Sequence, residues 1–499
     1  MFNEDINQLI NYGINNNLIE KEDSNYIANL LIGLFEEDEY IQNFEVRNEK
    51  LENILKSLVE YAIFKGIIKD TLVNRDSFDT KIMNTILDRP SNIIKKFNNL
   101  YSISPKKATD FYYNLSLKSN YIREDRIKKD IKWKVNTKYG EFYLTINLSK
   151  PEKDPKDILE TSKKVSENYP KCYICRENEG FKGNIDYPSK ENLRIIPIKI
   201  KDKKWYIQYS PYVYYNEHSI IFSEEHEPMK VKGNTFENLF DFIEKFPHYF
   251  IGSNAGIPIV GGSILNHLHY QGGRYDFPIF TAEAKEEFAV KKFKNIKCEI
   301  LNWPMTVIKL SSENYVELIE LGKNILEIWE NYTDEKVNIF SKTVEGRHNT
   351  VTPIARKNGG KYELYIALRN NITTKERPMG YFHPREKYHN IKKENIGLIE
   401  VMGLAVLPGR LKKEIEIIKE YIIKEKIADS NIIEKHKNII IDLKENTNIT
   451  LKNIDLLIKE NIGCKFSELL EEASVFKNTK EGREAIIKFI NKIKQININ

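Results

Sequence analysis

The residues best suited to chemistry are two histidines and a glutamine at alternate positions, His267, His269 and Gln271. If this segment is extended, the three side chains project from one face of a strand. Three polar groups on one strand face are costly to bury. The motif lies between Gly261-Gly262 and Gly272-Gly273, and glycines let a backbone approach a phosphate closely and present its N–H groups. The pattern favours a phosphate-handling site over the polar outer face of a sheet.

A second candidate is the pair Cys172 and Cys175. Four cysteines in 499 residues do not make a disulfide framework. A C-x-x-C pair in a reducing compartment is redox-active, half of a zinc site or incidental. The loop-like stretch Asn178-Glu179-Gly180 argues against a thioredoxin-like site, where the pair should open a helix. Two histidines would complete a tetrahedral zinc site. Spacing alone does not choose among His218, His226, His248, His267 and His269.

The composition is that of a soluble globular protein, with 41% hydrophobic and 30% charged residues. At roughly 150 residues per domain, the length suggests about three structural units. The net charge of +5 is too mild, and its signs too mixed, to indicate a nucleic-acid partner. No apolar run approaches the roughly 18 residues that span a bilayer. The N-terminus lacks the basic and apolar regions of a secretory signal. We therefore expect a cytoplasmic protein with no membrane partner.

Residues 1–130 have helical periodicity. The clearest helix runs from Glu49 to Lys65, where apolar residues form one stripe and Gly66 is placed to end it. Similar amphipathic runs occupy residues 4–18, 24–36 and 79–88. This region is predicted to be a helical scaffold.

Residues 131–290 have the pattern of a mostly antiparallel sheet with one covering helix. Lys132 to Asn147 is rich in β-branched and aromatic residues, and Tyr139-Gly140 predicts a turn between two strands. Phe236 to Lys245 fits the helix. Further strands are predicted at residues 193–200, 205–209, 219–222 and 249–253. Both candidate motifs lie in this block.

A related order of elements follows over residues 291–410. Strands near 296–310 precede a long helix from Asn314 to Asn331. Further strands are predicted at residues 337–340, 349–356 and 362–368, the last two joined by the hairpin signal Asn358-Gly359-Gly360. The repeat is architectural, since this block lacks the Cys and His pattern. Residues 411–499 return to charged helices, including Leu411 to Lys426.

Several long stretches match a known family. They are residues 169–180, 208–218, 246–255, 261–271, 349–356 and 393–403. They resemble the second, bacterial type of galactose-1-phosphate uridylyltransferase, which belongs to the histidine-triad-like superfamily. The resemblance covers most of residues 100–411 and, more loosely, the helical ends. It implies an α+β fold of two histidine-triad-like, mostly antiparallel sheet halves with covering helices, flanked by helical N- and C-terminal regions.

The resemblance also implies a reaction. The family moves a uridylyl group between UDP-glucose and galactose 1-phosphate, giving UDP-galactose and glucose 1-phosphate in the Leloir pathway of galactose metabolism. The implied route is ping-pong, with His269 as the nucleophile that becomes uridylylated and Gln271 as a hydrogen-bond partner of the phosphoryl oxygens. A homodimer is compatible with the resemblance.

The first type of the family binds zinc through a C-x-x-C pair, a later histidine and the first histidine of the core motif. Carried over, these ligands are Cys172, Cys175, His226 and His267. On this interpretation zinc is structural. The chain departs from the family in having Leu268 where a proline is usual. It also has no convincing match for the first type's uracil-binding segment or second metal site.

Three further residue types are expected at the nucleotide. Asn254 resembles an asparagine near the nucleotide phosphates. The backbone N–H groups of Gly261, Gly262 and Ser263, together with Gln271, could meet the charge on the phosphoryl oxygens.

Three alternatives remain open. Another nucleotidyl transferase or a hydrolase of the same superfamily is one, although such hydrolases usually carry a third histidine where this chain has Gln271. A non-catalytic, zinc-stabilised nucleotide-binding protein is the second, although such a protein would be expected to lose His269. A redox protein that cycles Cys172 and Cys175 is the third, and stoichiometric zinc would exclude it.

Overall fold

The computed structural model describes residues 2–41, 49–149, 169–184, 186–262, 264–425, 428–446 and 448–496. The chain divides into two compact units. The first comprises Met1–Lys129, Ser149–Val213 and Ser219–His226, and the second comprises Asp130–Leu148, Tyr214–His218 and Glu227–Asn499. Among the described residues, no helix is long and apolar enough to cross a membrane.

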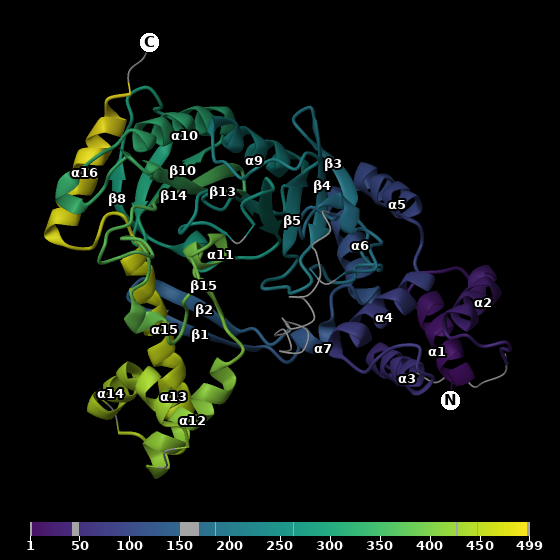
Figure 1. Cartoon of the computed structure of the whole chain (residues 1–499). Coiled ribbons are helices and arrows are strands. Elements are labelled where there is room, and N and C mark those ends of the chain that lie inside the picture. Colours follow the sequence, from purple (N-terminus) through teal and green to yellow (C-terminus); the bar gives the residue numbers. More distant parts are fainter. Residues whose placement is uncertain are drawn as a thin grey trace. The chain divides into compact units, whose positions relative to one another are not determined.

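The N-terminal part of the first unit is helical, as its periodicity predicts (Figure 1). In the predicted helix after Glu49, the buried residues include Ile54 and Leu58, and Gly66 follows its end with φ +76°. The helix expected at 79–88 begins earlier, because Thr71 caps it by accepting a hydrogen bond from the Asn74 N–H. The helices are α1 (Phe2–Asn15), α2 (Ser24–Leu34), α3 (Leu51–Phe64), α4 (Leu72–Thr85), α5 (Pro90–Ile103), α6 (Pro105–Lys118) and α7 (Glu124–Ile127).

The first unit also contains three antiparallel strands, β3 (Ile196–Ile200), β4 (Lys203–Tyr209) and β5 (Ser219–Ser223). All three lie where alternation and β-branched residues predict them. The buried Tyr112 of α6 donates its hydroxyl hydrogen bond to backbone carbonyls of Arg194 and Ile207, with O–O distances of 2.5 and 3.2 Å. This hydroxyl attaches the helical scaffold to the strands.

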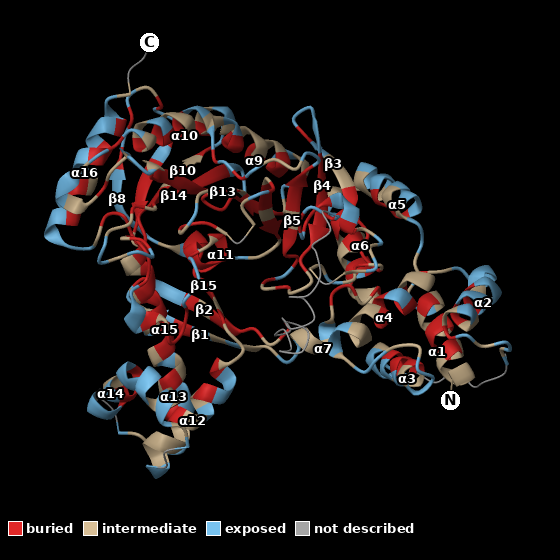
Figure 2. Cartoon of the chain, viewed as in Figure 1, coloured by how far each residue is buried: buried red, intermediate tan, exposed pale blue. Residues whose placement is uncertain are grey.

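The second unit is built on seven antiparallel strands in the order β7-β6-β13-β14-β10-β9-β8. Helices α9 (Gly233–Lys245) and α10 (Tyr315–Glu330) pack against them, and β13 and β14 are mostly buried (Figures 1 and 2). The strands are β6 (Phe250–Gly252), β7 (His269–Gly273), β8 (Ala284–Phe288), β9 (Lys297–Leu301), β10 (Val307–Ser312), β13 (Asn349–Asn358) and β14 (Lys361–Asn370).

Local signals in this unit are mostly confirmed. Asn358 pairs with Lys361 across the predicted Gly359-Gly360 turn, where Gly359 has φ +58°. The strand predicted at 337–340 is wrong. Glu335–Val337 forms one turn of 3-10 helix, and Asn338 follows in the left-handed conformation, which interrupts an extended strand.

The predicted hairpin of residues 132–147 is confirmed as β1 (Ile131–Thr137) and β2 (Gly140–Ile146). These strands pair with β15 (Leu404–Leu407) in a separate three-stranded sheet. Phe142 of β2 stacks on Trp303, with ring centroids 4.8 Å apart, and both belong to the core of the second unit. A short two-stranded sheet is formed by β11 (Lys342–Thr343) and β12 (Gly346–Arg347).

The C-terminal part of the second unit returns to helices, as predicted. They are α11 (Leu398–Val401), α12 (Leu411–Lys424), α13 (Ser430–Lys435), α14 (Lys437–Asn446), α15 (Ile454–Ala473) and α16 (Lys480–Lys494). The predicted α+β class with helical ends is therefore confirmed. The region boundaries 1–130, 131–290, 291–410 and 411–499 stay predictions.

Candidate active site and metal centre

The C-x-x-C loop is held by a buried asparagine. The Asn178 side-chain amide donates to the carbonyl oxygens of both Cys172 and Cys175, each at an N–O distance of 2.8 Å. Cys175 is followed by a single 3-10 turn, η2 (Arg176–Asn178), not by an α-helix. This geometry does not support a thioredoxin-like redox site.

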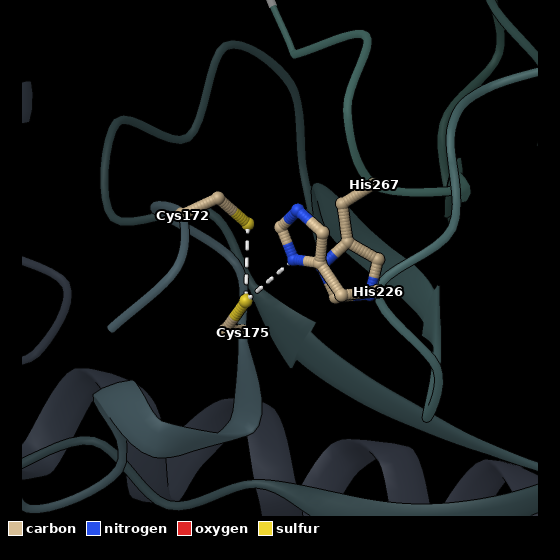
Figure 3. Close-up of side chains that lie close together, drawn as sticks. All are labelled: Cys172, Cys175, His226 and His267. Atoms are coloured by element: carbon tan, nitrogen blue, oxygen red, sulfur yellow. Dashed lines mark hydrogen bonds between the residues drawn. The ribbon is translucent and has the colours of Figure 1, made fainter. Parts of the chain in front are cut away.

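Four potential ligands come together at this loop (Figure 3). The ligand atoms of Cys172, Cys175, His226 and His267 all lie within 4.8 Å of one another. The two sulfurs are 3.3 Å apart, and Cys175 Sγ lies 3.1 Å from His226 Nδ1. A disulfide would need about 2.05 Å, so the cysteines are reduced. Two sulfurs and two imidazole nitrogens form the donor set that structural zinc prefers.

The thiols of the loop need a nearby positive charge in order to ionise. The hydrogen bond with Cys172 and burial raise the pKa of the Cys175 thiol, and a divalent cation reverses this by stabilising the thiolates. Burial lowers the pKa of Lys190 to about 8, against the opposing effect of the two cysteines. The Lys190 ammonium donates to the Tyr173 carbonyl at an N–O distance of 2.6 Å. This lysine thus places a further positive charge beside the loop.

The H-x-H-x-Q motif enters a strand only at its second histidine. Strand β7 begins at His269, so His267 precedes the strand. Within β7, His269 and Gln271 share one face, while Tyr270 on the other accepts a hydrogen bond from the Asn238 amide of α9. The common face expected for all three polar residues is therefore limited to His269 and Gln271.

His269 is buried, and its ring orientation is fixed by its own chain. Its Nδ1 lies 2.8 Å from the His267 carbonyl oxygen, which can only accept, so Nδ1 carries the proton. The Nε2 atom of the neutral ring then has the lone pair. The neighbouring Leu268 N–H donates to the Glu227 carbonyl at 2.6 Å, a hydrogen bond that the usual proline would lack. The hydrogen bond to the His267 carbonyl fixes the tautomer of the neutral ring and so defines Nε2 as its nucleophilic nitrogen.

Gln271 contacts a histidine that the sequence offered as a zinc ligand. Its Oε1 lies 3.2 Å from His218 Nε2. Burial lowers the pKa of His218 to about 3, so this ring is neutral at physiological pH. His218 is not among the grouped metal-ligand candidates, whereas His226 is.

The other predicted nucleotide-binding residues lie around one tight loop. Asn254 is buried, and its Oδ1 accepts a hydrogen bond from the Leu398 N–H at 2.9 Å. A Cβ on Gly262 would lie 2.6 Å from Asn254 Nδ2, and one on Gly261 would lie 2.9 Å from a backbone carbonyl oxygen. Both glycines are therefore required by close packing. Ser263 lies outside the described residues.

Comparison with known proteins identifies the family. The N-terminal domain of galactose-1-phosphate uridyl transferase matches residues 17–228, and its C-terminal domain matches residues 241–440. The chain belongs to this family. It is 50% identical to galactose-1-phosphate uridylyltransferase of Clostridium acetobutylicum, over 98% of this chain and 100% of the relative. It is 42% identical to the Bacillus subtilis protein of the same name, over 98% and 97% of the two chains.

The resemblance stated from the motifs is thus confirmed. Among solved structures, yeast Ap4A phosphorylase Apa2 matches with a TM-score of 0.34 and 11% identity, over 67% of this chain and 93% of that chain.

Sequence reasoning missed several polar residues of this family member. Glu217 is fully buried, accepts a hydrogen bond from the Tyr249 hydroxyl at 2.6 Å and pairs with Arg274. Nearby, Tyr249 and Arg274 line a cleft of about 580 Å³ that Arg356 also borders. Asn178 and Lys190 were missed as well. Only the position of Asn178, three residues after Cys175, offered a signal.

Proposed function

We propose that this protein is a uridylyltransferase that exchanges UMP between UDP-glucose and galactose 1-phosphate in galactose metabolism. The products are UDP-galactose and glucose 1-phosphate. The observation that carries the proposal is the near full-length similarity to relatives of that name, at 42–50% identity. Transfer is favoured over hydrolysis because Gln271 stands where hydrolases of the superfamily usually have a third histidine. On the basis of the family resemblance, we include a cytoplasmic homodimer in the proposal.

His269 is the proposed nucleophile. Its neutral Nε2 attacks the α-phosphorus of UDP-glucose, forming a P–N bond as the P–O bond to glucose 1-phosphate breaks with its electron pair. A phosphate oxygen of galactose 1-phosphate then attacks the same phosphorus, and the P–N electron pair returns to Nε2. The Nδ1 proton stays in its hydrogen bond with the His267 carbonyl, 2.8 Å away, and stabilises positive charge on the ring.

Charge on the phosphoryl oxygens needs donors that are already in place. The Gln271 amide and the backbone N–H groups of Gly261, Gly262 and Ser263 are proposed for this role. Asn254 is proposed near the nucleotide phosphates. The hydrogen bond that it accepts from the Leu398 N–H supports a second role, in which it holds the start of helix α11.

Zinc is proposed at Cys172, Cys175, His226 and His267, the four residues whose ligand atoms are grouped. When bound, the ion supplies a fixed positive charge that stabilises the two thiolates. The same His267 whose ring belongs to this group also offers its carbonyl oxygen to His269. Zinc is therefore a positioning device and takes no part in the bond changes.

Intact-protein mass spectrometry tests the proposal. The wild-type protein should gain one uridylyl mass on mixing with UDP-glucose and lose it on addition of galactose 1-phosphate, whereas His269→Ala should gain none. Release of glucose 1-phosphate without any adduct would favour hydrolysis and overturn the ping-pong route. An adduct that persists in His269→Ala would move the nucleophile to another residue, with His267 examined next.

A further inference from the structure

His218 carries an inference beyond the proposed reaction. The spacing made it one of five possible zinc ligands, yet the structure places its Nε2 atom 3.2 Å from Gln271 Oε1. Its ring is 3% exposed, so the side chain is excluded from bulk water. His218 thus contacts Gln271, which is proposed to bind the phosphoryl group. What this contact does depends on which ring nitrogen of His218 carries a proton.

The proton positions follow from the partners. His218 Nδ1 is buried and has no hydrogen-bond partner among the described residues. A buried N–H without an acceptor is costly, so the proton belongs on Nε2, where Gln271 Oε1 accepts it. Burial lowers the pKa of the ring to about 3, which keeps the second proton off Nδ1 near neutral pH. His218 is therefore a neutral Nε2–H donor.

The His218 ring is also held in place. It lies against the Tyr215 ring, with centroids 4.4 Å apart, and the Tyr214 ring, with centroids 5.5 Å apart. The Tyr215 hydroxyl donates to the Gly272 carbonyl at 3.1 Å, one residue beyond Gln271 in β7. The Tyr215 ring that packs against His218 is thus itself hydrogen-bonded to β7, the strand that carries Gln271.

This arrangement determines which end of the Gln271 amide faces a substrate. The carbonyl and NH2 groups of an amide point in different directions. When Gln271 Oε1 is fixed on the His218 ring, the NH2 group of Gln271 is therefore directed away from that ring. No hydrogen bond joins Gln271 Nε2 to another residue of the described chain. Without the hydrogen bond from His218, the Gln271 side-chain amide could flip. Its Oε1 would then face the anionic phosphoryl oxygens and repel them. A held amide presents only the donor.

We propose that His218 is a positioning residue for uridylyl transfer, which holds Gln271 Oε1 through its Nε2–H and so keeps the Gln271 NH2 group directed at the phosphoryl oxygens. The inference rests on the proposed function, because it requires a phosphoryl group opposite Gln271. His218 does not touch the reacting atoms itself.

Single-turnover kinetics with a double-mutant cycle test the inference. His218→Phe keeps a ring but removes the donor, and His218→Gln returns an N–H donor near the position of Nε2. At saturating UDP-glucose, we expect His218→Phe to slow uridylylation of His269 about 10- to 100-fold. The effect should not exceed the roughly 100-fold expected when a donor to the phosphoryl oxygens is removed altogether. KM for UDP-glucose should change little, and His218→Gln should recover most of the rate.

The cycle separates positioning from a merely structural role. In a Gln271→Ala background, His218→Phe should slow the reaction by less than about threefold, because no amide remains to be positioned. An equal loss in both backgrounds, or no recovery with His218→Gln, would overturn the inference.

Nuclear magnetic resonance of the wild-type protein gives a readout that needs neither a variant nor activity. With 15N-labelled histidine, the His218 signals should show protonated Nε2 and unprotonated Nδ1 from pH 6 to 8. The opposite tautomer, or a charged ring, would overturn the inference. A wild-type protein that shows this tautomer but forms no uridylyl adduct would instead overturn the proposed function.

Discussion

The C-x-x-C loop and strand β7 prepare their functional side chains in opposite ways. In the loop, protein groups hold the backbone, through the Asn178 amide, and the ligand atoms of Cys172 and Cys175 turn toward each other. In β7, protein groups hold one polar atom of each functional side chain, Nδ1 of His269 and Oε1 of Gln271. The loop therefore suits a single metal ion that all its ligand atoms contact. The strand suits a substrate that His269 and Gln271 each contact through the remaining polar atom, Nε2.

The largest effect is expected from removing the nucleophile. His269→Ala should lower the rate of uridylyl transfer by about 10⁴-fold or more, because the covalent route is lost. Zinc content and thermal stability should stay close to those of the wild type, since the ring lies outside the metal group. The measurements are coupled UDP-galactose formation, metal analysis by mass spectrometry and differential scanning calorimetry. Loss of zinc in this variant would contradict the separation of the two regions.

The second effect reverses that pattern. Cys175→Ala should abolish stoichiometric zinc and lower the midpoint of thermal unfolding by several degrees, with activity lost as a consequence of misplaced residues. Treatment of the wild type with a strong chelator should produce the same shift. Cys298→Ala is the matched control, because Cys298 is also buried and free but stands outside the grouped ligands. A Cys175→Ala protein that retained zinc would show that the ion is held elsewhere.

A third, smaller effect is expected from the residue that shapes the loop. Asn178→Ala removes both amide hydrogen bonds to the cysteine carbonyls and should weaken zinc binding about 10- to 100-fold. Competition with a chromophoric chelator measures this affinity. The exposed neighbour Lys171→Ala serves as the control and should bind zinc as the wild type does. Unchanged affinity in Asn178→Ala would mean that the ligands hold their own geometry.

The sequence predicted local features of the fold better than side-chain directions. The stripe around Leu58 and the turn at Gly359-Gly360 follow from periodicity and backbone preference, and both are confirmed. The strand predicted at 337–340 failed because hydrophobic content does not reveal the left-handed conformation of Asn338. Such a conformation depends on packing as well as on residue type.

The candidate site shows the same limit. Spacing singled out Cys172 and Cys175, but left five histidines open as their partners, His218 and His226 among them. These two histidines are eight residues apart and lie on either side of β5, so the same short stretch supplies one to the metal group and one to Gln271. Their different roles follow from the path of the folded chain and cannot be read from their spacing in the sequence. The resemblance favoured His226, and the grouped ligand atoms support that choice.

The last effect concerns Asn254, which is placed both in the fold and near the nucleotide phosphates. Asn254→Ala would leave the Leu398 N–H without its acceptor and should lower the free energy of unfolding by about 1–3 kcal/mol. Asn254→Asp keeps an acceptor for that N–H, so its stability, measured by urea denaturation, should stay closer to the wild type. If the Asn254 side chain also faces the nucleotide phosphates, the added negative charge should raise KM for UDP-glucose in the Asp variant. An Asp variant with normal stability and normal KM would mean that Asn254 serves the fold alone. A negative charge beside the nucleotide phosphates would repel them and raise KM.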